Sequence, residues 1–180
     1  MSEFEGFQKI ARLSRDCVIT EKIDGTNAQI FIADDFQTIK FGSRTRWITP
    51  ENDNFGFAKW GESNKEELLK LGPGRHFGEW WGSGIQRGYG LRNGEKRFSL
   101  FAVHLWNADN KPKCCEVVPT LYRGIFDTQK IEECLSELAN SGSKAAPGFM
   151  QPEGIIIYHE AAKTLFKKTV EKDYEPKGAQ

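Results

Sequence analysis

The stretch TEKIDGTNAQIFI, residues 20–32, decides how this chain folds around its chemistry. Residues 26–32 end in three apolar residues and predict a strand, and residues 17–22 before them predict another. The letters DGTN between them have the composition of a turn, so the two strands are expected to form a hairpin. Lys22 and Asp24 would stand at its mouth, and Gly25 would let the backbone turn tightly or approach a ligand closely.

The rest of the chain predicts further strands and two main helices. Apolar residues recur near a 3.6-residue period over residues 54–74 and 127–142, which predicts a helix in each range, with Asp127 as the N-cap of the second. Strands are expected over residues 36–41, 75–81, 97–106, 152–160 and 164–170, with a weaker candidate over 114–119. This order indicates one α+β domain over residues 1–180, built on antiparallel β-sheets with flanking helices.

The composition is that of a globular protein, with 38% hydrophobic and 28% charged residues. No apolar run approaches the ~20 residues that span a bilayer, so no membrane partner is expected. The acidic, mixed N-terminal segment is unlike a secretory signal. The four cysteines form no CxxC pair, which favours reduced thiols and a cytoplasmic location.

Charge is balanced overall but uneven along the chain. The formal net charge is +0, whereas residues 75–97 hold five Lys and Arg residues against two glutamates. Lys40, Arg44 and Arg46 form a second basic cluster. Such clusters are either solvated faces or phosphate-binding surfaces, and charge alone leaves both readings open.

Lys22 is either an exposed lysine at a strand end or a nucleophile. A lysine amine attacks only in its neutral form, which burial or a nearby cation favours. The residues around it decide between the two readings. Glu21-Lys-Ile-Asp-Gly-Thr-Asn27 resembles the nucleophile motif of the covalent nucleotidyltransferase superfamily, which comprises polynucleotide ligases and mRNA capping enzymes. With asparagine at position 27, the motif resembles that of the RNA ligase branch, which includes phage double-strand-type RNA ligases. DNA ligases and capping enzymes usually carry arginine at this position.

Five further stretches follow in the order of that superfamily's motifs, so the resemblance covers about residues 17–170. They are FGSRTR, FGEWWGSGIQ, RFSLFAVHLW, PEGIIIY and LFKKTV. The resemblance implies an ATP-grasp-like nucleotidyltransferase domain of the ligase and capping-enzyme type. It also implies that Lys22 attacks the α-phosphate of ATP to form lysyl-AMP, and that the AMP then passes to the 5′-phosphate of a strand before joining.

The resemblance implies a role for each candidate site residue. Glu21, Ile23 and Asn27, which surround the nucleophile in the sequence, would contact the nucleotide. Arg44 would bind the ribose and phosphates, Glu79 the ribose hydroxyls, and Phe101 would stack on the purine. Glu153 would bind a catalytic Mg²⁺ or Mn²⁺ ion, and Lys167 or Lys168 would bind the α-phosphate. Adjacent strand residues point to opposite faces, and Lys167 is expected to face the site. Phe101 is also compatible with a plain core position, and Ala102 stands where the family usually carries an acid.

The expected partner is RNA, either a nicked duplex or an RNA–DNA hybrid. No C-terminal OB-fold or helical domain is expected within residues 1–180, so a separate nucleic-acid-binding subunit is a candidate partner. Two alternatives stay open at this point. One is a DNA ligase or a GTP-using capping-type nucleotidyltransferase, and the other is a nucleotide- or RNA-binding module that has lost ligation.

Overall fold

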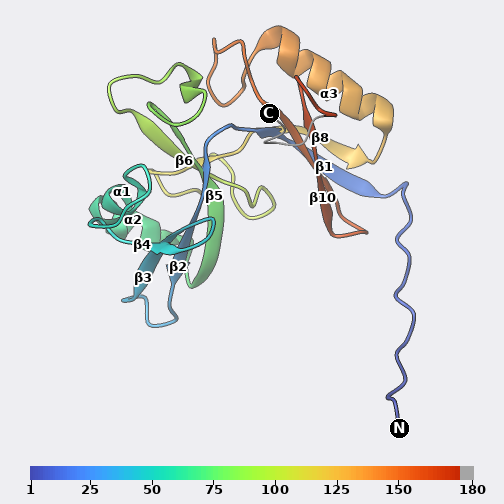
Figure 1. Cartoon of the computed structure of the whole chain (residues 1–180), viewed down its shortest axis with the longest axis horizontal. Helices are drawn as coiled ribbons and strands as arrows, with labels where there is room; N and C mark the ends of the chain where they lie inside the picture. Colours follow the sequence, from blue (N-terminus) through green and yellow to red (C-terminus); the bar gives the residue numbers. More distant parts are fainter. Residues whose placement is uncertain (175–180) are drawn as a thin grey trace.

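Two β-sheets, each covered by helices on its outer face, make up the part of the chain that the computed structural model describes, residues 1–174 (Figure 1). Sheet A has the strand order β10-β9-β1-β8, and all of its pairs are antiparallel. Its strands are β1 (Asp16–Lys22), β8 (Thr120–Ile125), β9 (Gly154–His159) and β10 (Thr164–Thr169).

Sheet B has the strand order β4-β3-β2-β5-β6-β7 and is antiparallel except for the pair β6–β7. Its central strands are long and buried on the helix side, which fits their apolar alternation. The strands are β2 (Thr26–Ile32), β3 (Ile39–Ser43), β4 (Trp47–Ile48), β5 (Gly74–Gly82), β6 (Lys96–Leu100) and β7 (Glu116–Val117).

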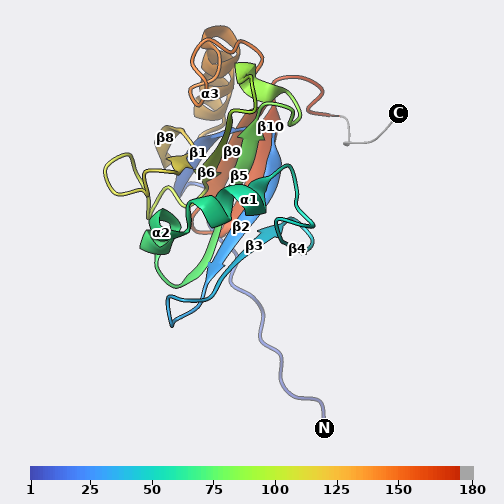
Figure 2. The ribbon, with the colours of Figure 1, turned by 90° about the vertical axis from the view of Figure 1, so that its left-hand side faces the viewer.

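Helix α3 (Thr128–Ser141) covers sheet A, and Asp127 caps it by accepting a hydrogen bond from the Gln129 N–H at 2.8 Å, as predicted. Ile131 and Leu138 of this helix pack on β1 and β9. Helices α1 (Phe57–Ser63) and α2 (Lys65–Leu68) lie across sheet B, followed by the 3₁₀ turn η1 (Leu69–Leu71) (Figure 2). Among residues 1–174, none of the helices is both long and apolar enough to cross a bilayer.

The prediction of a hairpin around DGTN is wrong. Strands β1 and β2 belong to different sheets, and the short link between them crosses from sheet A to sheet B. A third apolar cluster packs at this crossing, beside the two cores under the helices. Its buried members are Ile23, Trp81, Tyr89, Val118 and Ala146.

Other elements also differ from their predictions. The helix expected over residues 54–74 is split at Asn64, because Gly61, Ser63 and Asn64 are weak helix formers. The third strand begins at Ile39 because the Asp35 carboxylate accepts hydrogen bonds from two N–H groups of the preceding turn. Strand β8 was missed altogether, since its alternation of polar and apolar residues is weak. A second 3₁₀ turn, η2 (Gly88–Gly90), lies in the loop between β5 and β6.

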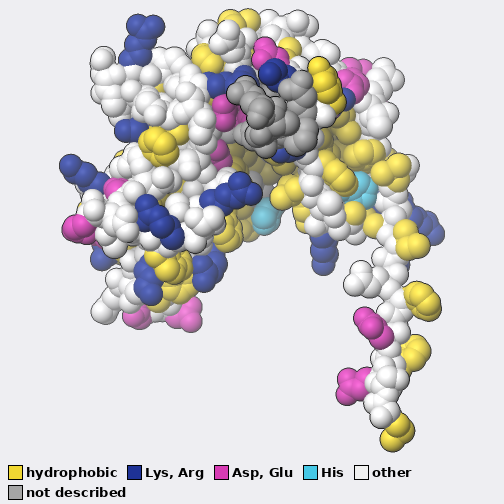
Figure 3. All heavy atoms as spheres, in the orientation of Figure 1, with side chains coloured by type: hydrophobic (Ala, Val, Ile, Leu, Met, Phe, Trp, Pro, Cys, Tyr) yellow, Lys and Arg dark blue, Asp and Glu magenta, His cyan; other side chains and the backbone are white. Residues whose placement is uncertain are grey.

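The uncovered faces of the two sheets lie on either side of a recess. Figure 3 shows it between the lobe that carries β2, β3 and β4 and the lobe that carries β10. Because β1 ends and β2 begins at the head of this recess, residues of the motif around Lys22 reach both sheets.

Candidate active site

Gly25 allows the chain to cross from one sheet to the other. A Cβ atom at this position would lie 2.4 Å from the Trp80 backbone oxygen and 2.8 Å from the Trp81 Cβ. A side chain therefore has no room here, and the glycine serves close approach to β5 rather than a hairpin turn. The crossing fixes Lys22 at the end of β1 and Asn27 at the start of β2, on opposite sides of the recess.

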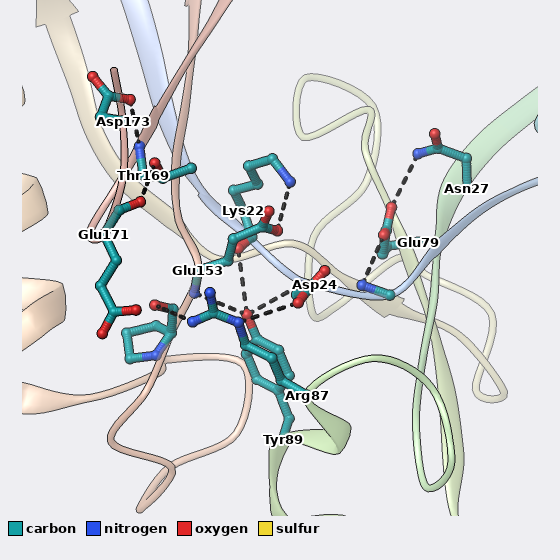
Figure 4. Close-up of polar contacts among 12 residues, drawn as sticks. Lys22, Asp24, Asn27, Glu79, Arg87, Tyr89, Glu153, Thr169, Glu171 and Asp173 are labelled. Atoms are coloured by element: carbon teal, nitrogen blue, oxygen red, sulfur yellow. Dashed lines mark hydrogen bonds and ion pairs between the residues drawn. The ribbon is translucent and has the colours of Figure 1, made fainter. Parts of the chain in front are cut away.

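Lys22 forms an ion pair with Glu153. The Lys22 Nζ lies 2.5 Å from the Glu153 Oε2, and the two side chains are 19% and 3% exposed (Figure 4). Strand register explains the pairing, since Lys22 is opposite Gly154, the residue after Glu153. The sequence motifs KIDG and PEGIIIY therefore meet through adjacent strands, and the carboxylate holds the amine in place.

Glu79 faces this pair from sheet B. Its carboxylate accepts hydrogen bonds from the Gly25 N–H at 3.0 Å and from the Asn27 amide at 3.1 Å. Burial raises the pKa of Glu79 from 4.5 to about 7, against the lowering effects of the Gly25 N–H and the nearby Lys22. Glu153 and Asp24 also raise this pKa through charge repulsion, so Glu79 titrates near neutrality.

We expect the free energy of unfolding of Glu79→Gln to increase, relative to that of the original protein, as pH rises. The folded pKa of Glu79 exceeds its unfolded value, so the stability associated with this group is present below pH 4.5 and is lost as pH rises through 7. Between pH 5 and 8 the difference in unfolding free energy should shift by about 2 kcal/mol in favour of the variant. Urea unfolding at both pH values measures it, and Glu62→Gln, at an exposed site, is the control. A pH-independent difference would contradict the prediction.

Lys167 and Lys168 lie on opposite faces of β10. Lys167 is opposite Ile156, and Ile156 is opposite Thr20, so these three side chains lie on one face of sheet A. Lys22 is two residues after Thr20 in β1 and lies on the same face, which we call the inner face because it is turned away from α3. Lys168 is on the helix side and forms an ion pair with Glu132 of α3 at 2.5 Å. Contact of Lys168 with the nucleotide is therefore wrong, whereas Lys167 stays a candidate for the α-phosphate.

Phe101 and Arg44 each follow directly after a strand of sheet B, β6 and β3 respectively. The Phe101 side chain is 41% exposed, and its N–H donates to the Phe77 oxygen, which places it just beyond the end of β6. The strand expected over residues 97–106 ends at Leu100, because the following residues form a turn closed on the Ala102 oxygen. Arg44 is exposed and makes no hydrogen bond or ion pair with the other described residues.

The side chains of Glu21 and Ile23 point away from the site. Glu21 is 1% exposed on the helix side of β1 and accepts hydrogen bonds from the Ser143 hydroxyl and from the Lys144 and Ala145 N–H groups, at 2.5–2.9 Å. Ile23 is buried in the cluster where the sheets meet. Contact of these two residues with a nucleotide stays a prediction, and it would involve their backbone atoms, because the Glu21 carboxylate holds the loop after α3.

Two residues that the sequence reasoning did not place in the site organise it. The buried Tyr89 hydroxyl accepts from the Asp24 N–H at 3.0 Å and the Glu153 N–H at 3.2 Å, and donates to the Lys22 oxygen at 3.4 Å. Arg87 pairs with the Asp24 carboxylate at 3.1 Å and donates to the Gln151 oxygen. The basic loop that carries Arg87 and Tyr89 therefore ties the Lys22 motif to the Glu153 motif.

A divalent metal at this site would be held by Glu153 together with the substrate. Within residues 1–174, no group of three or more His, Cys, Asp or Glu residues could hold a metal on its own. Mg²⁺ in phosphate-transfer sites commonly takes one or two carboxylates and completes its shell with phosphate oxygens and water. One buried carboxylate beside the amine fits that pattern.

Comparison with known proteins identifies the family to which this site belongs. A family model described as RNA ligase matches residues 15–170. The chain belongs to the RNA ligase family. The resemblance of its motifs is thereby confirmed, as is the expected α+β nucleotidyltransferase fold.

Solved RNA ligases share the fold at low sequence identity. A variant of the Naegleria gruberi RNA ligase with ATP and Mn matches at a TM-score of 0.62 and 18% identity, over 91% of this chain and 52% of that chain. Another variant, with AMP and Mn, matches at 0.61 and 17%, over 87% and 50%. The chain thus spans about half the length of the Naegleria chains. A search among curated proteins gave no match.

Proposed function

We propose that the protein is an ATP-dependent RNA ligase that forms a covalent lysyl-AMP at Lys22. The observation that carries this proposal is the 2.5 Å pair between Lys22 and Glu153, inside a motif that resembles the ligase nucleophile motif. Membership of the RNA ligase family supports the reaction class. The Naegleria structures with ATP, AMP and Mn support ATP as donor and a divalent metal as cofactor.

Each step of the proposed reaction has a residue available for it. The Lys22 ammonium first loses a proton to solvent, and the neutral amine then attacks the α-phosphorus. The bond to the β-phosphate oxygen breaks, pyrophosphate leaves, and the nitrogen gives up a second proton as the phosphoramide forms. Lys167 and Arg44 supply positive charge for the phosphates, and Glu79 with Asn27 accepts and donates hydrogen bonds at the ribose. Phe101 offers an exposed ring for the purine. A metal bound at Glu153 would neutralise phosphate charge.

The joining steps use the same centre. AMP passes from Lys22 to the 5′-phosphate of an RNA strand, and a 3′-hydroxyl then displaces AMP and seals the strand. A nicked RNA duplex or RNA–DNA hybrid is the proposed substrate, with any further grip on it supplied by a separate subunit or domain. The four free cysteines fit a reducing, cytoplasmic setting.

The first step is tested by labelling. The protein is incubated with ATP and Mg²⁺ or Mn²⁺, denatured, and examined for bound label. We expect label from α-labelled ATP and none from γ-labelled ATP, because the γ-phosphate leaves with pyrophosphate. Stronger labelling from α-labelled GTP would instead indicate a capping-type enzyme, and label without any joined product on nicked RNA or DNA would indicate a module that has lost ligation.

A further inference from the structure

Sheet B carries a cluster of aromatic and cationic side chains away from the candidate active site. The Arg75 guanidinium lies 5.3 Å from the Phe31 ring centre and 5.4 Å from the Trp47 ring centre. The Lys40 Nζ lies 5.9 Å from the Trp47 ring. We call these four residues, Phe31, Lys40, Trp47 and Arg75, the aromatic–cation cluster.

Strand register places this cluster on the same sheet face as Glu79. Asn27 is opposite Glu79 and Phe31 is opposite Arg75, and residues directly opposite each other in an antiparallel pair share a face. Phe77, opposite Gln29, lies between them. Asn27 and Phe31 are four positions apart in β2, which is about 13 Å along the strand. One strand of a duplex places a phosphate every ~3.4 Å along its axis, so a strand leaving the site would reach the cluster within a few nucleotides.

This face of the sheet is uncovered, unlike the face under α1 and α2. The side chain of Trp47 is 45% exposed and that of Phe77 is 52% exposed. In Figure 3, Lys and Arg side chains flank hydrophobic ones on the lobe that carries β2, β3 and β4. Large exposed rings that lie together on one face mark a surface for a partner.

The charges on this face favour a polyanion. Glu79 is the only acidic residue among the residues of β2, β3, β4 and β5 that share the face, and it is held by Gly25 and Asn27. Unpaired bases stack on aromatic side chains while neighbouring cations follow the phosphates. Sheets that display exposed aromatic rings bind single-stranded RNA in this manner.

We propose that the aromatic–cation cluster binds an unpaired segment of RNA that adjoins the paired end held in the active site. A base stacks on Trp47, and Arg75 and Lys40 contact its phosphates. The inference rests on the function proposed above for the choice of RNA, but it concerns binding alone and requires no covalent step.

The test measures the affinity of the whole protein for a short 5′-phosphorylated, single-stranded RNA by fluorescence anisotropy without ATP. Trp47→Ala should weaken binding about ten-fold, which is within the range for the loss of one stacked base, and Trp47→Phe should retain most of the affinity. Arg75→Gln should weaken binding and flatten its dependence on salt by about 0.7 in the log–log slope, as expected for one lost phosphate contact. Phe166→Ala, which removes a 51%-exposed ring beside α3, should bind like the original protein.

Three results would overturn the proposal. The first is an RNA affinity of Trp47→Ala within two-fold of that of the original protein. The second is a loss of RNA affinity in Phe166→Ala as large as that in Trp47→Ala. Sedimentation could also show that Trp47→Ala dissociates a dimer without changing RNA affinity, which would make this face an interface between copies. Labelling by ATP is measured separately, so a protein that takes label but binds RNA independently of Trp47 refutes the cluster alone. If the original protein takes no label and Trp47→Ala still weakens RNA binding, only the lysyl-AMP proposal is refuted.

Discussion

Lys22→Arg is expected to abolish labelling of the protein by α-labelled ATP while retaining a cation beside Glu153. A guanidinium remains protonated in proteins, so it has no lone pair with which to attack phosphorus. The arginine can still pair with the carboxylate, which separates the loss of a nucleophile from the loss of an ion pair. We expect a fall of at least ~1000-fold, as is found when a nucleophile is removed.

Lys22→Ala is the companion variant and should lose the label equally. It also removes the ammonium from a carboxylate that is 3% exposed, so it should unfold at lower denaturant concentration than Lys22→Arg. Denaturing electrophoresis measures the label, and urea unfolding measures the difference between the two variants. Full labelling of Lys22→Arg would exclude Lys22 and direct attention to Lys167, the other lysine on this face of the sheet.

The sequence predicted which residues gather at the site better than it predicted how the chain brings them together. Lys22, Glu79 and Glu153 each stand in or beside a strand with a clear apolar pattern, and these strands formed nearly as expected. Alternation identifies a strand but not its neighbour. The letters DGTN are compatible with a hairpin turn and with a crossing between sheets, so the sequence alone does not separate the two.

Two features of the site differ in how far the sequence could predict them. The position of Glu21 was predictable, because successive strand residues point to opposite faces and Lys22 already occupied the inner one. Tyr89 was not predictable in this way. Its hydroxyl contacts backbone groups of the Lys22 and Glu153 motifs, and such contacts depend on folded geometry rather than on any pattern of side chains. A positive φ of 51° at a non-glycine residue is likewise invisible in the letters GYG.

Lys167→Ala is expected to slow adenylation about 100-fold, whereas its neighbour Lys168→Ala should stay within about three-fold of the original rate. Lys167 lies on the inner face with Lys22, and its side chain makes no hydrogen bond or ion pair within residues 1–174, so its charge is available to a phosphate. Lys168 is committed to Glu132 on the far side of the sheet. Exposed ion pairs of this kind contribute at most about 1 kcal/mol, so its loss should affect stability slightly and the reaction hardly at all.

Single-turnover labelling with α-labelled ATP over a range of ATP concentrations measures both variants. Because the negative charge on the transferring phosphoryl group must be stabilised as the amine attacks, the loss in Lys167→Ala should persist at saturating ATP. Lys167→Arg, which keeps the charge, should recover part of the rate. The reverse order, with Lys168→Ala slow and Lys167→Ala near normal, would mean that β10 pairs with β9 one residue out of the register described here, since only that shift would turn Lys168 towards Lys22.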